Sequence, residues 1–210
     1  MKLFRLIFSL IKKLWGWILA DEIRPLSFSE LEPIALPGNF KLGYSLGKYR
    51  ENNRKRTKLG KLVYHFKYKK NKKAGEILVD LSSQLLQQNY PDFDVIVSVP
   101  PAIASTHFFA NRFFSESLSD RVQKPLENKL IQRIRFTTEQ KDFRNLTGKK
   151  GNVKDSFKIS EPDKLKGKTV LLIDDIYDSG ATVNEISGLL KSALARKVFV
   201  FTIAKTGFYD

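Results

Sequence analysis

The chain has 210 residues, a formal net charge of +15, no cysteine, two histidines and 42% hydrophobic residues. At roughly 100–200 residues per domain, this length allows one domain with a small extension and a sizeable core. The lack of cysteine excludes a disulfide framework, an iron–sulfur site and a cysteine nucleophile, and two histidines are too few for a His-rich zinc site. So large a positive charge favours polyanionic partners, such as nucleic acid, phosphorylated substrates or an acidic membrane surface.

Residues 1–20 predict a basic amphipathic helix. Polar or small residues recur at spacings of three and four, so they share one helical face while apolar residues fill the other. The uncharged run is too short to span a membrane, and Lys12 and Lys13 interrupt the apolar stretch that a secretory signal needs. Two interpretations stay open: the helix lies on an anionic membrane, or it packs on its own domain or on a partner protein.

The next two segments differ in composition. Residues 21–47 contain three prolines and three glycines with little periodicity, which predicts an irregular linker. Residues 48–73 hold twelve basic residues against one acidic residue, Glu51, and part of this tract should be helical. Its interleaved aromatics suit nucleic-acid binding, and the alternative is a solvated basic helix whose aromatics face the core.

The remainder alternates between predicted helices and strands. Apolar residues recur at helical spacing over 74–88, and a further helix is expected over 104–122. Short β-branched runs predict three buried strands, over 94–99, 169–174 and 197–204. Apolar residues at helical spacing predict one more helix between the second and the third of these strands. Residues 137–156 are polar and basic, which indicates a long loop. A strand–helix–strand unit with apolar strands predicts an α/β fold with a mostly parallel sheet flanked by helices.

The segment from Leu171 to Thr182 carries the predicted chemistry. A buried strand ends in Asp174 and Asp175, and open α/β sheets bind ligands at the carboxyl ends of their strands. The turn that follows can hold a phosphate with its backbone N–H groups and the positive end of the next helix; its residues are Asp178, Ser179, Gly180, Ala181 and Thr182. Thr182 and Glu185 also fit a capping box.

Because carboxylates accept hydrogen bonds from vicinal hydroxyls, an acidic pair beside a phosphate-binding turn suits a ribose that carries a 5-phosphate. The chain contains neither the GxxxxGK[ST] nor the GxGxxG pattern, which argues against a P-loop nucleoside triphosphatase and a dinucleotide-binding enzyme.

Residues Val170 to Thr182 resemble the signature of type I phosphoribosyltransferases that binds phosphoribosyl pyrophosphate (PRPP). That signature has four hydrophobic residues, two acidic residues and a turn that ends in T/S-G-x-T, and Asp178 stands here where threonine is commoner. Three further stretches are similar to the ComF family of competence-associated phosphoribosyltransferases: 60–69 with its Lys-Tyr pair, 95–100 and 138–157. The resemblance covers about residues 44–206, without the four-cysteine zinc module that members of the family often carry.

The resemblance implies a Rossmann-like type I phosphoribosyltransferase fold and Mg²⁺-dependent phosphoribosyl transfer from PRPP, with a role in DNA uptake. Asp174 and Asp175 would be the catalytic pair, holding the ribose hydroxyls and contacting Mg²⁺, while residues 178–182 would bind the 5-phosphate. The pyrophosphate would meet Pro100 and Pro101 and a basic loop over 137–154; the basic residues of that loop include Lys141, Arg144, Lys149 and Lys150.

These observations predict three parts and one principal alternative function. The parts are the helix of residues 1–20, the linker of 21–47 and a phosphoribosyltransferase-like domain over 48–210. We expect the chain in the cytoplasm, with a peripheral membrane contact through residues 1–20 as a further option. The alternative is a non-catalytic competence protein that binds nucleic acid or the competence machinery and uses the fold as a PRPP sensor or scaffold.

Overall fold

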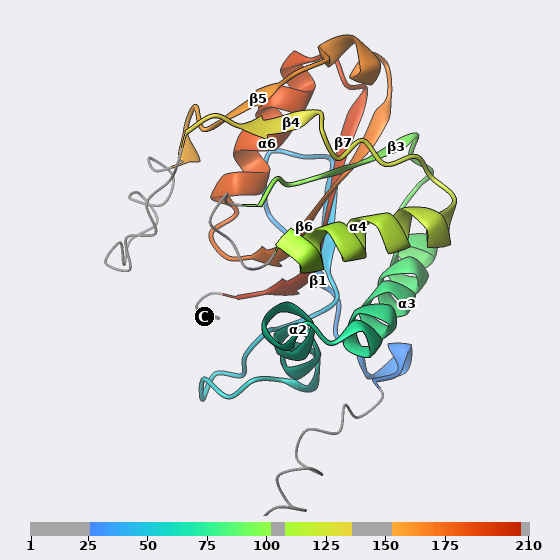
Figure 1. Ribbon diagram of the computed structural model, residues 1–210, viewed down its shortest axis with the longest axis vertical. Helices are drawn as coiled ribbons and strands as arrows, with labels where there is room; N and C mark the ends of the chain where they lie inside the picture. Colours follow the sequence, from blue (N-terminus) through green and yellow to red (C-terminus); the bar gives the residue numbers. More distant parts are fainter. Residues whose placement is uncertain (1–25, 102–107, 136–152, 207–210) are drawn as a thin grey trace, which may run out of the picture.

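The computed structural model describes residues 26–101, 108–135 and 153–206 (Figure 1). The predicted helix of residues 1–20 lies outside these residues, as does most of the basic loop. The helices are α2 (Lys58–Lys69), α3 (Lys72–Asn89), α4 (Phe108–Val122) and α6 (Ala181–Ser192), with 3-10 turns η1 (Phe28–Glu30) and η2 (Pro162–Leu165). The strands are β1 (Ile34–Ala35), β2 (Leu42–Ser45), β3 (Val95–Ser98), β4 (Ile131–Arg133), β5 (Phe157–Ile159), β6 (Thr169–Tyr177) and β7 (Lys197–Lys205).

A five-stranded sheet with the order β1-β2-β7-β6-β3 forms the centre of the fold. The pairs β2–β7, β7–β6 and β6–β3 are parallel, and only β1 runs antiparallel to its neighbour β2 within this sheet. A separate antiparallel pair, β4–β5, lies outside it. The predicted α/β class with a mostly parallel sheet is therefore confirmed.

Part of the predicted linker belongs to the sheet. Within residues 21–47, β2 pairs in parallel with β7 from Leu42↔Phe199 to Ser45↔Thr202, and β1 pairs with β2. The expectation of an irregular segment is therefore wrong for these strands. They are short, and Gly43 lies inside β2 with its α-carbon against the Phe40 ring, where a side chain would collide. Strands this short give too little periodicity to be recognised from the sequence.

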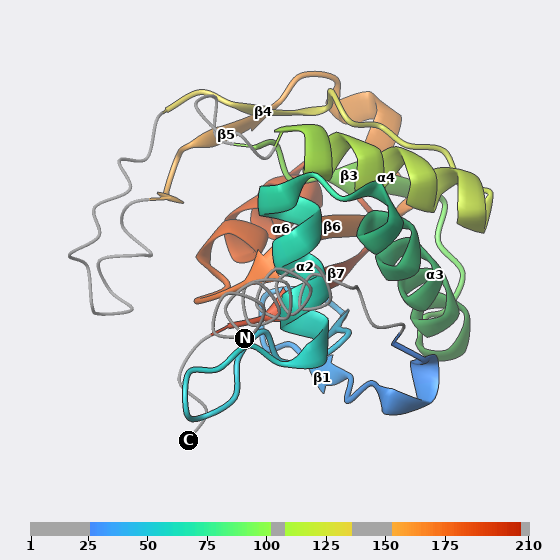
Figure 2. The ribbon, with the colours of Figure 1, turned by 60° about the horizontal axis from the view of Figure 1, so that its bottom comes forward.

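Helices cover both faces of the sheet (Figures 1 and 2). One core joins α2, α3 and α4 to one face through residues such as Phe66, Leu78 and Phe201. The other core joins α6 and the β4–β5 pair to the opposite face through residues such as Ile186 and Leu172. Because the sheet is covered on both sides, the middle stretches of β3, β6 and β7 are continuous apolar runs rather than alternating ones.

Strand β6 is longer than predicted. It continues past Asp174 to Tyr177 because β7 pairs with it as far as Ile176↔Ala204 and Tyr177↔Lys205. Leu171 and Ile173 belong to the core under α2, α3 and α4, whereas Val170 and Leu172 belong to the core under α6. Successive side chains of a strand point to opposite faces, so this alternation also decides where the two aspartates point.

The basic tract divides into a turn and helix α2. Tyr49 and Phe66 are buried in the core, as the solvated-helix alternative predicts. Tyr64 and Tyr68 instead stack on each other with ring centroids 5.2 Å apart, and Tyr68 keeps 52% of its surface exposed. In the part of the chain that the structure describes, no helix is long and apolar enough to cross a membrane.

Candidate functional site

The turn between β6 and α6 has the geometry of a phosphate-binding loop. Helix α6 begins at Ala181, directly after Gly180, which adopts a left-handed conformation with φ of +74°. Gly180 has no side chain with which to cap the helix, and the Ser179 hydroxyl accepts a hydrogen bond from the Ala181 N–H at 3.4 Å. The first N–H groups of a helix lie at its positive end. Such a terminus attracts phosphate oxygens, and the half-buried hydroxyl groups of Ser179 and Thr182 lie on the same turn.

The predicted capping box at Thr182 and Glu185 is wrong. Gly180 is the N-cap, and Thr182 already lies inside the helix. The Glu185 carboxylate accepts a hydrogen bond from the backbone N–H of Asp155 at 2.9 Å instead. A glycine that tolerates positive φ allows the chain to turn earlier than the pattern predicts, so the helix starts before Thr182.

Asp178 is exposed, and its carboxylate is turned toward the end of β7. It accepts a hydrogen bond from the Thr206 hydroxyl at 3.0 Å. The charge that Asp178 introduces into the signature is therefore engaged by a neighbouring segment.

A segment far away in the sequence braces this turn. The Tyr177 hydroxyl donates to the Pro37 carbonyl at 2.6 Å. Asn184 donates to the Gly180 carbonyl at 2.8 Å and accepts from the backbone N–H of Asn39 at 2.5 Å. Nothing in the sequence pattern pointed to residues 37–39, because their contribution is made through tertiary hydrogen bonds across more than a hundred residues.

The two aspartates lie next to each other on β6 but make contacts on different faces of the sheet. Asp175 forms an ion pair with Lys67 of α2 at 2.5 Å. Asp174 accepts a hydrogen bond from the backbone N–H of Asp175 at 2.8 Å and is attracted by Arg133 of β4 on the other side. The pair is thus held by α2 on one face and approached by β4 on the other.

Lys67, like Arg133, is a charged residue of this region that the sequence interpretation did not assign to the site. Its side chain is only 8% exposed. Burial opposes the charge on its ammonium group, but the attraction of Asp175 and the hydrogen bond that Lys67 donates to its carboxylate outweigh this, so the pKa of Lys67 is raised. The sequence signal was its place in the Lys-Tyr pair of the ComF-like stretch.

A small cavity of about 10 Å³ lies beside the acidic pair, with room for about one water molecule. It is lined by Asp174, Asp175 and Lys67 together with residues of α4, among them Asn111 and Phe114. Asn111 is tied to the end of β3, because its side-chain amide donates to the Val99 carbonyl at 3.2 Å.

Of the predicted pyrophosphate contacts, only the two prolines can be placed. Pro100 and Pro101 are half-buried and follow Val99, whose N–H donates to the Ile173 carbonyl at 2.9 Å. They therefore lie at the sheet edge where Asp174 begins the polar part of β6. Lys141 and Arg144 lie outside the described residues.

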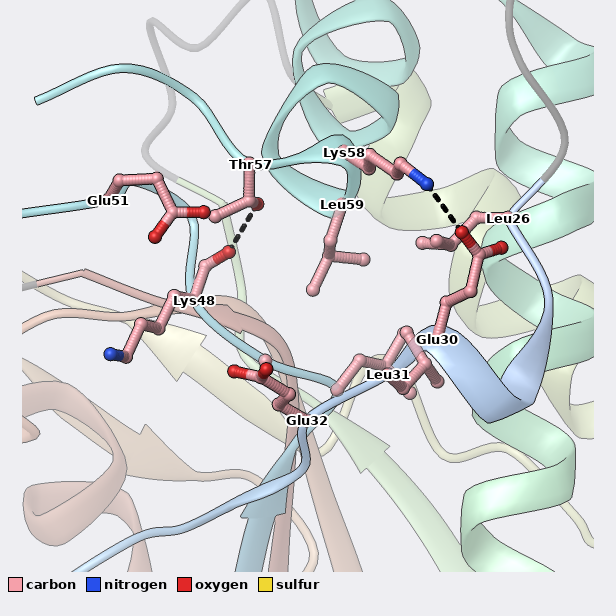
Figure 3. A pocket seen from close by; sticks show the side chains of 11 residues that line it. Leu26, Glu30, Leu31, Glu32, Lys48, Glu51, Thr57, Lys58 and Leu59 are labelled. Carbon is pink, nitrogen blue, oxygen red and sulfur yellow. Dashed lines mark hydrogen bonds and ion pairs between the residues drawn. The ribbon is translucent and has the colours of Figure 1, made fainter.

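A larger hollow of about 280 Å³ lies elsewhere, between η1 and the start of α2 (Figure 3). Four leucines give it an apolar wall: Leu26, Leu31, Leu46 and Leu59. Around its rim, Lys58 pairs with Glu30, and the Thr57 hydroxyl donates to the Lys48 carbonyl at 2.6 Å. None of the signature residues lines this hollow. The site that the motif predicts is therefore not at the larger of the two cavities.

Asp174 should make the stability of the fold depend on pH. Burial, followed by repulsion from Asp175, raises the pKa of the Asp174 carboxyl from 3.8 to about 7. The folded chain therefore binds a proton more tightly than the unfolded chain, and this stabilisation is present below about pH 4 and lost as the pH rises to about 7. Asp174→Asn has no such proton to lose. Its free energy of unfolding, relative to that of the unaltered chain, should therefore rise by on the order of 2 kcal/mol from pH 5 to pH 8, which thermal unfolding at several pH values measures.

The exposed Asp163 is a suitable control for that experiment, since Asp163→Asn also removes one negative charge. A difference between Asp174→Asn and the unaltered chain that stays constant from pH 5 to pH 8 would contradict this role of the buried carboxyl.

Comparison with known proteins finds similarity over part of the chain. Residues 114–207 match the family described as phosphoribosyl transferase domain, a stretch that contains β6, the turn and α6. The chain is also 27% identical over 92 residues to competence protein F of Haemophilus influenzae, a match that covers 43% of this chain. The matched region spans 40% of the length of that relative.

Solved structures similar to this chain include two phosphoribosyltransferases. For the adenine phosphoribosyltransferase of Thermoanaerobacter pseudethanolicus the identity is 16% and the TM-score 0.42, with 65% of this chain and 83% of that chain covered. For a hypoxanthine phosphoribosyltransferase of Staphylococcus aureus the identity is 21% and the TM-score 0.39, with 63% of this chain and 62% of that chain covered. The domain match and the relative named for competence confirm the resemblance to ComF-like type I phosphoribosyltransferases.

Proposed function

We propose that the chain binds PRPP at the carboxyl end of β6 and transfers its phosphoribosyl group to a nitrogen nucleophile. The observation that carries the proposal is the start of α6 directly after the left-handed Gly180, close in sequence to the acidic pair and inside the matched domain. The N–H groups of residues 178–182 would hold the 5-phosphate, and Asp174 and Asp175 would accept hydrogen bonds from the ribose hydroxyls.

In the proposed reaction the bond between the anomeric carbon and pyrophosphate breaks, and the pyrophosphate departs with the bonding electrons. A ring nitrogen of the acceptor base forms the new bond and then loses its proton. The sugar passes through a positively charged, oxocarbenium-like state, which carboxylates close to the ring stabilise. Placing Asp174 and Asp175 beside the ring supplies that negative charge without requiring a side chain to act as nucleophile.

Magnesium fits this donor set when it arrives with the ligand. No cluster of three or more His, Cys, Asp or Glu side chains that could hold a metal occurs among the described residues. Mg²⁺ commonly binds through substrate phosphates with one or two carboxylates, and Asp174 and Asp175 could provide these. The ion would neutralise charge on the departing pyrophosphate.

Calorimetric titration of PRPP with Mg²⁺ into the full chain tests the proposal. We expect binding in the micromolar range, and a loss of at least about hundredfold in Asp174→Asn/Asp175→Asn, because two charge-assisted acceptors for the ribose are removed. The control is Asp163→Asn/Asp92→Asn, which removes two exposed carboxylates far from the turn and should bind normally. Unchanged binding by the Asp174/Asp175 variant would show that the ligand does not use this pair.

The second candidate, a nucleic-acid contact in competence, is favoured by the surface of α2. The Arg56 guanidinium lies 4.0 Å from the centre of the Tyr64 ring, which stacks in turn on the exposed Tyr68. Bases stack on such aromatic platforms, and surrounding cations neutralise phosphates. We propose that this surface and the PRPP site act together in the cytoplasm, with residues 1–20 available for a peripheral membrane contact. Salt-sensitive binding of single-stranded DNA that Tyr68→Ala weakens would support this candidate, and binding unaffected by Tyr68→Ala would count against it.

A further inference from the structure

The ion pair between Lys67 and Asp175 has a consequence for ligand binding. An acidic pair is a poor place to receive a ligand that carries several phosphate groups, because like charges repel. Lys67 reduces this repulsion on one side of the sheet, since its buried ammonium lies 2.5 Å from the Asp175 carboxylate. Lys67 also attracts Asp174.

The contact also fixes the direction of the carboxylate. Lys67 binds the Oδ2 atom of Asp175, and the Asp175 side chain remains 28% exposed. Neighbouring apolar residues of α2, Phe66 and Val63, are buried in the core, so the helix cannot easily turn Lys67 away. An immobilised donor on one oxygen leaves the exposed part of the carboxylate for a second partner in a defined orientation.

We propose that Lys67 is a positioning residue of the sugar site: it orients Asp175 and compensates its charge, so that the carboxylate accepts a ribose hydroxyl beside a polyanionic tail. This inference rests on the proposed function. Lys67 acts through Asp175 and does not touch the ligand. The site therefore depends on α2, which lies outside the matched domain of residues 114–207.

The test is a set of binding titrations with Lys67→Met, Asp175→Asn and the double variant. The ligands are PRPP with Mg²⁺, ribose 5-phosphate and 2-deoxyribose 5-phosphate. We expect Lys67→Met to weaken PRPP binding by about tenfold to hundredfold. It should also reduce the preference for ribose 5-phosphate over the 2-deoxy sugar. In the Asp175→Asn background, Lys67→Met should change neither quantity further, because the group through which it acts is already altered.

Two controls separate this role from a loss of structure. Lys69→Met removes an exposed charge from the same helix and should leave all three affinities unchanged. The double variant removes both members of the ion pair, so it keeps the region neutral if Lys67→Met alone folds poorly.

The outcomes distinguish the two proposals. If the unaltered chain does not bind PRPP, the proposed function fails and this inference fails with it. If the unaltered chain binds and Lys67→Met binds equally well, only the role of Lys67 is overturned. It is also overturned if Lys67→Met weakens both sugar phosphates by the same factor, since a merely structural role would leave the preference between them unchanged.

Discussion

Replacing Lys67 with methionine should lower the free energy of unfolding by about 2–3 kcal/mol. Removing one member of a buried ion pair leaves the other charge without its partner, and here Asp175 would remain next to Asp174. This value lies at or below the roughly 3–5 kcal/mol that fully buried pairs cost, because the Asp175 side chain keeps 28% of its surface exposed and water can reach it. Urea denaturation at neutral pH, followed by circular dichroism, measures the change.

The double variant Lys67→Met/Asp175→Asn should recover most of this loss, because neither charge is then buried alone. Lys69→Met, on the exposed side of α2, should stay within about 0.5 kcal/mol of the unaltered chain. If Lys67→Met and the double variant were equally destabilised, the ion pair would not be the cause.

Gly180→Ala should cost about 2–4 kcal/mol and disrupt the turn that we propose binds phosphate. Gly180 has a φ of +74°, which residues with a side chain rarely adopt. A β-carbon there would lie 2.2 Å from the Tyr177 hydroxyl oxygen. Tyr177 cannot easily withdraw, because it is buried and its hydroxyl is bonded to the Pro37 carbonyl. Thermal unfolding measures the loss of stability, and titration with inorganic phosphate measures the loss of binding.

Gly188→Ala is the matched control in the same helix. A β-carbon at Gly188 meets no atom within 4 Å, so this change should stabilise α6 by up to about 1 kcal/mol. Adding Tyr177→Phe to Gly180→Ala should restore little of the stability, because the ring carbons Cζ and Cε2 would still lie 2.6 and 2.9 Å from the β-carbon and the bond to Pro37 is lost. An unperturbed Gly180→Ala chain would mean that the turn does not require the left-handed glycine.

Much of the fold could be predicted from the sequence because its elements have strong local signals. The strands over 94–99, 169–174 and 197–204 are confirmed by β3, β6 and β7, since buried parallel strands form unbroken apolar runs. The predicted helices over 74–88 and 104–122 are confirmed for the described residues by α3 and α4.

The parts that the sequence did not predict depend on tertiary pairing. Strands β1 and β2 are only two and four residues long, and their place in the sheet comes from β7, more than 150 positions away. The start of α6 was misplaced because Gly180 turns the chain earlier than the capping pattern indicates.

For the candidate site too, residues with a local sequence signal were predicted and those that depend on tertiary contacts were not. The signature identified the acidic pair and the turn, because their residues are contiguous. The roles of the site residues stay predictions, and their supports could not be read from local pattern. Lys67 was one of twelve basic residues in its tract, marked only by its place in the Lys-Tyr pair, and the fold shows its contact by burying it against Asp175. The brace from residues 37–39 consists of backbone groups, which carry no sequence signal.

Amide chemical-shift mapping of the isotope-labelled chain during titration with PRPP and Mg²⁺ tests the location of the site most directly. The account predicts that the largest changes occur at Gly180, Ala181 and Thr182, and that inorganic phosphate moves the same amides. Changes centred on Gly47 and Leu59, which line the larger hollow of Figure 3, with residues 178–182 unmoved, would contradict it.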